Sequence, residues 1–401
     1  MKTLTRLIFL FAWMLCLTSL AGRAEAGAAP DAVPAGTGYP AASAEPHTAA
    51  DYISRGQLYA RQYQEELALA DFNRAIALEP GLAIAYTKRA DIYQSQQNFA
   101  AALTDYNRAI ALDPGEMLNY TGRGSLYAMQ GQYDLAMTDC QQALALQPEK
   151  AEPYTTRGVL YCLQKKYDLA IADYNRAIAL DAQNSSAYSS RGTAYWFTGN
   201  TAAAFADFEQ AIRLDPRDST TYTTRGNIYL YLQRSDAAID DFTQAIKLNP
   251  HNQMAYSNRG AAYVYQHNYT AAIDDFTQVL SLNPQASDIY NNRAYVYIQI
   301  GQDDAAIADC SQAIALEPQN EAAYKNRGQA YLNQQHYDLA MADCSQAIAL
   351  DPQNAPAYSI RGQIYEALGR KDQAIADLTQ ALKLDPQLTE AARHLKKLQN
   401  S

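Results

Sequence analysis

The 401-residue sequence lacks most of the features that an enzyme or a nucleic-acid-binding protein needs. Its five histidines are scattered, and none is spaced from another histidine or a cysteine as metal ligands are. It has no phosphate-binding glycine loop and no nucleophile motif. Acidic residues outnumber basic ones, 42 to 32, and no basic tract occurs, which argues against nucleic acid as a partner. We therefore expect no enzymatic activity, no cofactor and no bound metal ion.

Long apolar runs are also absent, except at the N-terminus. Lys2 and Arg6 precede an apolar stretch, 7–17, which is followed by the small-residue site Ala24-Glu25-Ala26. This order is typical of a secretory signal peptide, so we predict cleavage after Ala26 and export to the periplasm or the extracellular space. An uncleaved N-terminal membrane anchor is the alternative. No other stretch is apolar enough to span a bilayer, so no membrane span is expected after cleavage.

Residues 27–48 are rich in alanine, proline and glycine and carry almost no charge. Such a composition cannot bury a core, and we expect a flexible linker.

Tryptophan and phenylalanine are scarce, at 2 and 9 residues, but there are 31 tyrosines. The excess has a positional cause, because the segment 49–388 repeats every 34 residues. Prolines mark the register, and Ala182 replaces the proline at one step. We predict ten repeats, which occupy 49–82, 83–116, 117–150, 151–184, 185–218, 219–252, 253–286, 287–320, 321–354 and 355–388.

Within each repeat, apolar and small residues fall at helical spacing. Positions 4 and 11 are tyrosine, and position 8 is glycine except at Ala90 and Ala294. A second set follows at positions 20, 24 and 27, and the proline at position 32 ends the second helix. We expect two antiparallel helices per repeat, with the small residue at position 8 facing the alanines at 20 and 27. Residues 389–401 continue with an apolar stripe, which predicts a C-terminal capping helix.

The pattern Y-x2-R-G-x2-Y, then A-x3-F-x2-A, then proline, with a period of 34, resembles the tetratricopeptide repeat. The resemblance implies an all-α fold, an α-solenoid of ten helix-turn-helix repeats that forms a right-handed superhelix. Position 7 is arginine where the family often has leucine, and position 4 is tyrosine where it often has tryptophan.

Every repeat has arginine at position 7 and aspartate at position 23. Position 7 lies near the tyrosine face, so its guanidinium should be partly buried, and a buried charge needs a partner of opposite sign. We predict structural ion pairs between these positions, within or between repeats, for example Arg225 with Asp241 and Arg259 with Asp275.

Four cysteines follow the predicted cleavage site, and three of them, Cys140, Cys310 and Cys344, occupy position 24. Since that position holds an aromatic residue in most repeats, we expect buried thiols. Equivalent cysteines in successive repeats are too far apart for a disulfide.

The resemblance implies that positions 2, 5, 9, 12 and 13 of the first helices line a concave groove. Positions 12 and 13 become apolar and aromatic in the middle of the array, and position 6 is asparagine in three successive repeats. An amide both donates and accepts, which suits the backbone of an extended peptide. The alternative is that these side chains only pack or solvate the repeats. The candidate groove residues are Trp196, Phe197, Asn227, Leu230, Tyr231, Asn258, Val264, Tyr265, Asn292, Ile298 and Asn326.

Three functions remain open on this evidence. The first is an exported, non-catalytic scaffold for protein–protein interaction, which binds an extended peptide or a partner protein in the groove. The second is a carbohydrate-handling scaffold in an envelope polysaccharide or cell-wall assembly, because amides and aromatic rings also suit sugars. The third is a regulatory subunit of a separate enzyme. The basic clamp with which members of this family hold chaperone C-termini is absent, since Lys325 is followed by Gln329 and Ile360.

Overall fold

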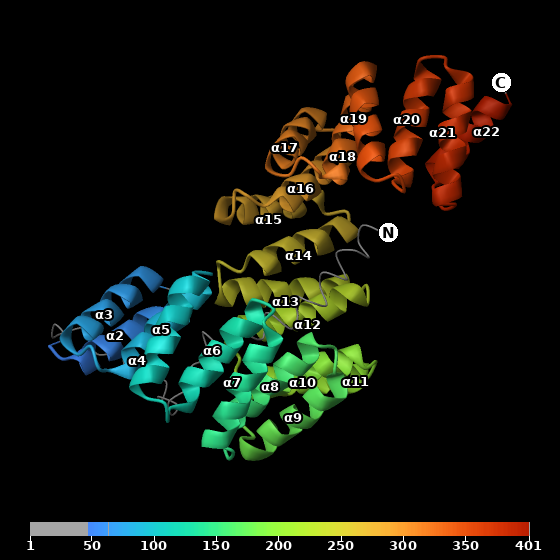
Figure 1. Cartoon of the computed structure of the whole chain (residues 1–401). Helices are drawn as coiled ribbons and strands as arrows, with labels where there is room; N and C mark the ends of the chain where they lie inside the picture. Colours follow the sequence, from blue (N-terminus) through green and yellow to red (C-terminus); the bar gives the residue numbers. More distant parts are fainter. Residues whose placement is uncertain (1–46, 63, 401) are drawn as a thin grey trace. The chain divides into compact units, whose positions relative to one another are not determined.

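The computed structural model describes residues 47–62 and 64–400, and all regular secondary structure in this part of the chain is helical (Figure 1). The predicted signal peptide, and all of the predicted linker except residues 47 and 48, lie outside the described residues. The predicted all-α fold of consecutive helix pairs is confirmed. Two units, Met1–Arg225 and Gly226–Ser401, are described separately below, and their boundary falls within α12.

The first helix of each pair begins on the first residue of a 34-residue repeat. These helices are α2 (Ala49–Arg61), α4 (Ala83–Ser95), α6 (Met117–Met129), α8 (Ala151–Leu163), α10 (Ser185–Phe197), α12 (Ser219–Tyr231), α14 (Gln253–Tyr265), α16 (Ser287–Gln299), α18 (Glu321–Asn333) and α20 (Ala355–Ala367).

The second helix of each pair ends on the leucine at position 30. These helices are α3 (Glu65–Leu78), α5 (Phe99–Leu112), α7 (Tyr133–Leu146), α9 (Tyr167–Leu180), α11 (Thr201–Leu214), α13 (Ser235–Leu248), α15 (Tyr269–Leu282), α17 (Asp303–Leu316), α19 (Tyr337–Leu350) and α21 (Lys371–Leu384). A last helix, α22 (Thr389–Gln399), follows the tenth pair.

Polar caps set the boundaries between repeats. Asn320 and Asn354 precede first helices, and each side-chain oxygen accepts a hydrogen bond from a backbone N–H of the first turn, at 3.0 Å. At Ala182, where the proline is missing, α9 still ends at Leu180 and Asn184 caps α10 in the same way. The turn therefore survives without the proline, and no longer helix replaces it.

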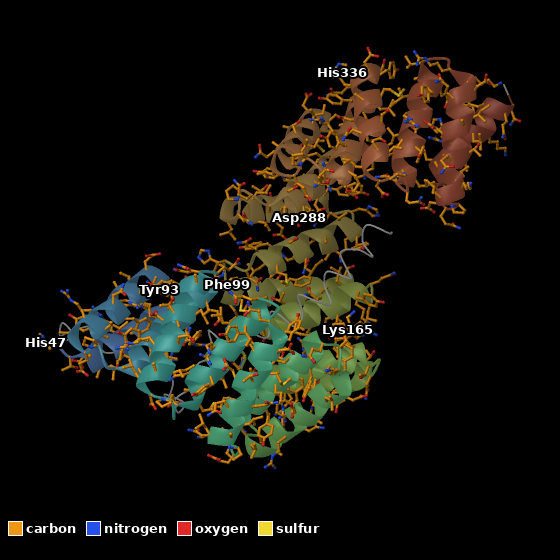
Figure 2. All side chains as sticks on the ribbon, viewed as in Figure 1. His47, Tyr93, Phe99, Lys165, Asp288 and His336 are labelled. Carbon is orange, nitrogen blue, oxygen red and sulfur yellow. The ribbon has the colours of Figure 1, made fainter. Side chains whose placement is uncertain are left out.

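In the nine repeats where the structure describes position 15, the turn between the two helices has a left-handed backbone there. Gly301 and Gly369 have φ values of 70° and 71° there, but Lys165 and Gln335 adopt the same conformation at 59° and 62°. Figure 2 shows Lys165 in the turn that follows α8. Since only glycine adopts this region without steric cost, several of these turns are strained.

In the repeats with glycine at position 8, the side chain at position 24 packs against that glycine in the core. A Cβ atom on Gly260 would lie 2.8 Å from Cε1 of Phe276, and one on Gly328 would lie 2.8 Å from the Cys344 Sγ. The glycine also faces the alanine at position 20, as the sequence led us to expect, since a Cβ atom on Gly192 would lie 3.0 Å from the backbone oxygen of Ala204. The larger side chain at position 24 crosses the space between the helices and reaches the first helix's backbone.

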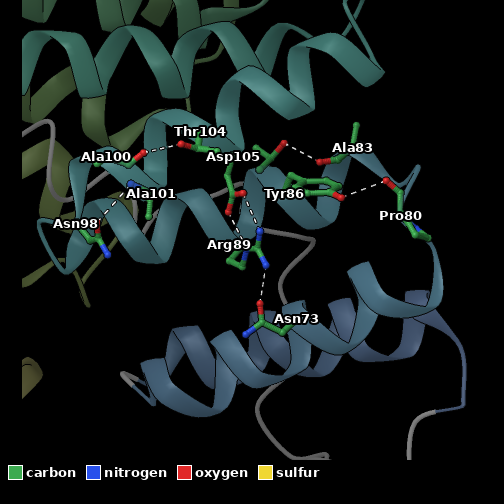
Figure 3. A network of polar contacts seen from close by, with 11 residues as sticks. Asn73, Pro80, Ala83, Tyr86, Arg89, Asn98, Ala100, Ala101, Thr104 and Asp105 are labelled. Carbon is green, nitrogen blue, oxygen red and sulfur yellow. Dashed lines mark hydrogen bonds and ion pairs between the residues drawn. The ribbon is translucent and has the colours of Figure 1, made fainter.

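The arginines at position 7 form their ion pairs within a repeat. Arg89 donates two hydrogen bonds to Asp105, from Nε at 2.7 Å and from Nη2 at 2.8 Å, while Nη1 donates to Asn73 of the preceding repeat at 2.6 Å (Figure 3). The guanidinium also lies between the rings of Tyr86 and Tyr93, at 5.6 and 5.8 Å from their centroids. Equivalent Arg–Asp pairs begin at residues 55, 123, 157, 191, 259, 293, 327 and 361. The tyrosines at positions 4 and 11, which account for most of the tyrosine excess, therefore flank the arginine of their own repeat.

Arg225 and Asp241 belong to different units, so their pairing stays a prediction. Arg225 lies over the ring of Tyr222 at 5.9 Å, as its counterparts do over theirs.

All four cysteines in the described part of the chain are buried thiols. Burial raises the pKa of both Cys310 and Cys344 to about 12, so these thiols stay protonated and unreactive.

Helix α22 packs against α20 and α21 through the apolar stripe expected from the sequence. Ala391 and Leu398 are buried there with Leu378. Glu366 on α20 accepts hydrogen bonds from Lys397 at 2.8 Å and lies 2.6 Å from Nδ1 of His394. Across the described residues, no helix has both the length and the apolar character that crossing a membrane requires.

Candidate binding surface on the first helices

The candidate groove residues lie on five successive first helices, α10 to α18, but no single cavity contains them all. Trp196 and Phe197 belong to the N-terminal unit, and the other nine to the C-terminal unit. In the C-terminal unit, one cavity of about 320 Å³ includes two of them, Ile298 and Asn326.

Phe197 has a packing role. Its ring stacks on Tyr167 with the centroids 5.1 Å apart and the planes 15° from parallel. Both rings adjoin a core cluster that contains Cys162 and Tyr174. For this residue the structure shows the packing that the sequence left open as the alternative. Trp196 beside it is partly buried.

Two of the three asparagines at position 6 are engaged across repeat boundaries. Asn258 donates to the side-chain oxygen of Asn227 at 2.8 Å. Asn326 is buried and donates to the side-chain oxygen of Asn291 at 2.7 Å. Only Asn292 has an amide without a hydrogen-bond partner among the described residues. The asparagines at position 6 therefore join neighbouring first helices in two of the three repeats.

The aromatic and aliphatic candidates divide in the same way. Tyr231 and Tyr265, both at position 13, are 54% and 47% exposed. Leu230 and Val264, at position 12, are partly buried, and Val264 packs against the core cluster around Phe276. In α12 and α14, position 13 thus offers contact area to a partner, whereas position 12 contributes to stacking.

The cavity is formed by three first helices and the start of the cap. Residues from α16, α18 and α20 form its walls, and Leu388 and Glu390 close one end. The lining combines amides with apolar side chains: Tyr295, Ile298, Gln299, Lys325, Asn326, Gln329, Asn333, Pro356, Ser359, Ile360, Gln363, Leu388 and Glu390.

Several polar side chains in the cavity are not hydrogen-bonded to other described residues. Gln299, Ser359 and Gln363 form no side-chain hydrogen bond within the described residues. Gln329, by contrast, donates to Asn333, whose own amide donates to Asp303 on α17, both at 2.8 Å. The unpaired groups are donors and acceptors of the kind that match a peptide backbone.

Lys325, at position 5 of its repeat, is the residue that sequence reasoning set aside. It lines the cavity and is partly buried, and its ammonium has neither a hydrogen bond nor an ion pair with any described residue. Burial lowers its pKa below the usual lysine range, and neighbouring groups such as Cys310 and Glu321 only partly counteract this effect. One signal was present in the sequence, because position 5 is apolar or neutral in every other repeat.

In the part of the chain that the structure describes, no group of three or more histidine, cysteine, aspartate or glutamate side chains is placed to bind a metal ion.

The family comparison agrees with the repeat pattern. Models described as tetratricopeptide repeat match residues 83–116, 119–150, 185–218, 219–252, 258–321 and 328–398, and one described as TPR repeat matches 158–199. A search of curated proteins finds no match.

Solved structures with some likeness to the chain include three proteins of low identity. YrrB, described as a TPR protein with an unusual peptide-binding site, is 22% identical over 47% of this chain and 97% of its own, with a TM-score of 0.40. A tetratricopeptide repeat protein from Parabacteroides merdae is 21% identical over 62% of this chain and 99% of its own, at 0.48. Yeast Tom70 is 15% identical over 88% and 95%, at 0.41.

The periodic sequence, the helix pairs that begin at each repeat and the family models that match along most of the array lead to one conclusion. The chain belongs to the tetratricopeptide repeat family.

Proposed function

We propose that this protein is an exported, non-catalytic scaffold that binds an extended segment of a partner protein along its first helices. Proteins of this family serve mainly as platforms for protein–protein interaction. The observation that carries the proposal for this chain is the cavity between α16, α18 and α20. Unpaired amides and a hydroxyl lie there beside isoleucines and a tyrosine.

Export rests on the N-terminal sequence alone, with its basic start, short apolar stretch and small-residue site. The compartment that follows from it is the periplasm or the extracellular space.

The predicted right-handed superhelix would turn the first helices inward and bring their variable positions together.

The test is binding to an array of N-acetylated, C-amidated decapeptides of varied sequence, run beside a glycan array. We expect the full chain to bind a subset of peptides and no glycan. The change Gln363→Ala should weaken peptide binding by about ten-fold, the loss of one or two hydrogen bonds to a ligand. Tyr265→Ala, which removes an exposed ring on α14, should act in the same direction.

Leu169→Ala is the matched control, because Leu169 is an equally exposed side chain on a second helix, α9. It should leave peptide binding unchanged. Binding to glycans without binding to peptides would replace the proposal with the carbohydrate-handling alternative.

A further inference from the structure

The cavity in the C-terminal unit contains a single cation. Among its lining residues only Lys325 is basic, and its ammonium forms no hydrogen bond or ion pair within the described residues, although Glu321, four residues earlier on α18, favours its charged form. A buried or half-buried lysine is normally paired, because removing an ammonium from water costs free energy that an opposite charge must offset. An unpaired ammonium in an open cavity is therefore a site that a ligand completes.

The neighbours of Lys325 define the ligand further. The polar side chains of Gln299, Ser359 and Gln363 are unpaired within the described residues, while Ile298 and Ile360 supply apolar walls. Amides and a hydroxyl can bind the backbone of an extended chain, and isoleucines bind its aliphatic groups. The combination matches one acidic side chain together with the peptide backbone next to it.

The one acidic residue in the lining limits the number of charges that the site accepts. Glu390 lies at the cap end of the cavity, where it is exposed and accepts a hydrogen bond from Arg393 at 3.3 Å. A second carboxylate of the partner near this end would meet a like charge. The site therefore suits an isolated acidic residue better than an acidic run.

On this basis we propose that the cavity between α16, α18 and α20 binds one glutamate or aspartate side chain within an extended partner peptide, with Lys325 as the counter-ion. This inference rests on the proposed function and names the chemistry of the segment that is bound. The desolvation that lowers the pKa of Lys325 is consistent with it, since a bound carboxylate would restore the charged form.

The experiment uses the full chain and blocked peptides, N-acetylated and C-amidated, in matched pairs that differ by glutamate against glutamine at one internal position. Fluorescence polarisation gives the affinity of each member. We expect the glutamate member of the bound pairs to bind at least about ten-fold more tightly, as a charge-assisted hydrogen bond implies. The preference should weaken at high salt.

Four variants separate the charge from the structure. Lys325→Gln should abolish the preference while glutamine peptides still bind, and Lys325→Arg should keep it. Lys383→Gln makes the same charge change at an exposed site on α21 and should have no effect. Glu390→Gln should allow peptides with a second acidic residue near the first to bind as well.

The possible outcomes distinguish the two proposals. Equal binding of glutamate and glutamine members, or a preference that survives Lys325→Gln, overturns the role of Lys325 and leaves peptide binding intact. A free peptide C-terminus that binds as well as the internal glutamate would overturn the assignment to a side chain. Binding of no peptide, or of an oligouronate in place of peptides, overturns both proposals.

Discussion

Arg259 shows how an arginine at position 7 contacts groups from its own repeat and from the preceding one. Arg259 donates to both carboxylate oxygens of Asp275, at 2.9 and 2.7 Å, and to the Thr243 hydroxyl at 3.0 Å. The rings of Tyr256 and Tyr263 lie at 5.7 and 5.9 Å from its guanidinium carbon. Because Thr243 belongs to the preceding repeat, the pair also connects two repeats. The hydrogen bonds to Asp275 raise the pKa of Arg259, so the arginine stays charged.

A double-mutant cycle on Arg259 and Asp275 should show strong coupling. Their side chains are only 16% and 5% exposed, so Arg259→Met leaves a buried carboxylate and should lower the free energy of unfolding by about 3 kcal/mol. Asp275→Asn should cost about as much, and the double variant much less than the sum, with a coupling energy above about 1 kcal/mol. Urea denaturation followed by circular dichroism measures all three.

The exposed pair Arg393 and Glu390 is the control, with side chains 73% and 61% exposed. Its coupling energy should stay below about 0.5 kcal/mol, as for other solvated pairs. Equal coupling at both pairs would show that burial does not strengthen the arginine–aspartate interaction.

At the scale of the helix pair, the weakest local feature is the turn between the two helices. Position 15 has positive φ in every repeat where the structure describes it, yet five of these residues are not glycine. A side chain in this region costs about 1 kcal/mol, because its Cβ crowds the carbonyl oxygen. The repeats with glycine there should therefore have the less strained turns.

Gln335→Gly should stabilise its repeat by about 1 kcal/mol, since Gln335 has φ 62° and no side-chain hydrogen bond within the described residues. The reciprocal change, Gly301→Gln at φ 70°, should destabilise by a similar amount. Thermal and urea denaturation of both variants test the pair. If Gln335→Gly lowered stability, the entropy that glycine adds to the unfolded chain would outweigh the relief of strain.

For the whole molecule, the periodicity of the sequence was sufficient to predict an all-α fold of consecutive helix pairs. Repeats that stack on one another in the same way require the same side chains at the same positions. This produces a pattern with a period of 34 residues, from which the fold can be predicted. In the same way, invariant arginine and aspartate indicated ion pairs, although not that they form within a repeat. The aspartate at position 23 of the next repeat is chemically identical to that of the same repeat, and only its distance from the arginine differs.

The candidate surface was less predictable for a physical reason. Whether Asn258 is offered to a ligand depends on whether Asn227, one repeat earlier, accepts its hydrogen bond. The cavity around Lys325 depends on side-chain sizes on three helices and on the position of the cap. Such properties arise between repeats that differ from one another, and a pattern shared by all the repeats does not contain them.

Stacking also makes stability local, because in both units the helices make their main contacts with helices one or two places away in the chain. The cap helix α22 provides the clearest test. Burial raises the pKa of Glu366, but hydrogen bonds from Lys397 and His394 outweigh it, and the net shift is downward from 4.5. A lowered carboxyl pKa stabilises the folded form above the unfolded pKa, and this stability is lost as the pH falls through the folded pKa.

We therefore expect Glu366→Gln at neutral pH to reproduce the effect of acid on the cap. Hydrogen exchange followed by mass spectrometry should show faster exchange in α22 and in the adjoining helices α20 and α21. Exchange in α4 and α5, in the other unit, should be unchanged, because these two helices make their main contacts with each other and with α2, α3 and α6. The control Glu152→Gln makes the same chemical change at an exposed site on α8 and should leave α22 as it was. A uniform increase along the whole chain after Glu366→Gln would show instead that the array unfolds as a single cooperative unit.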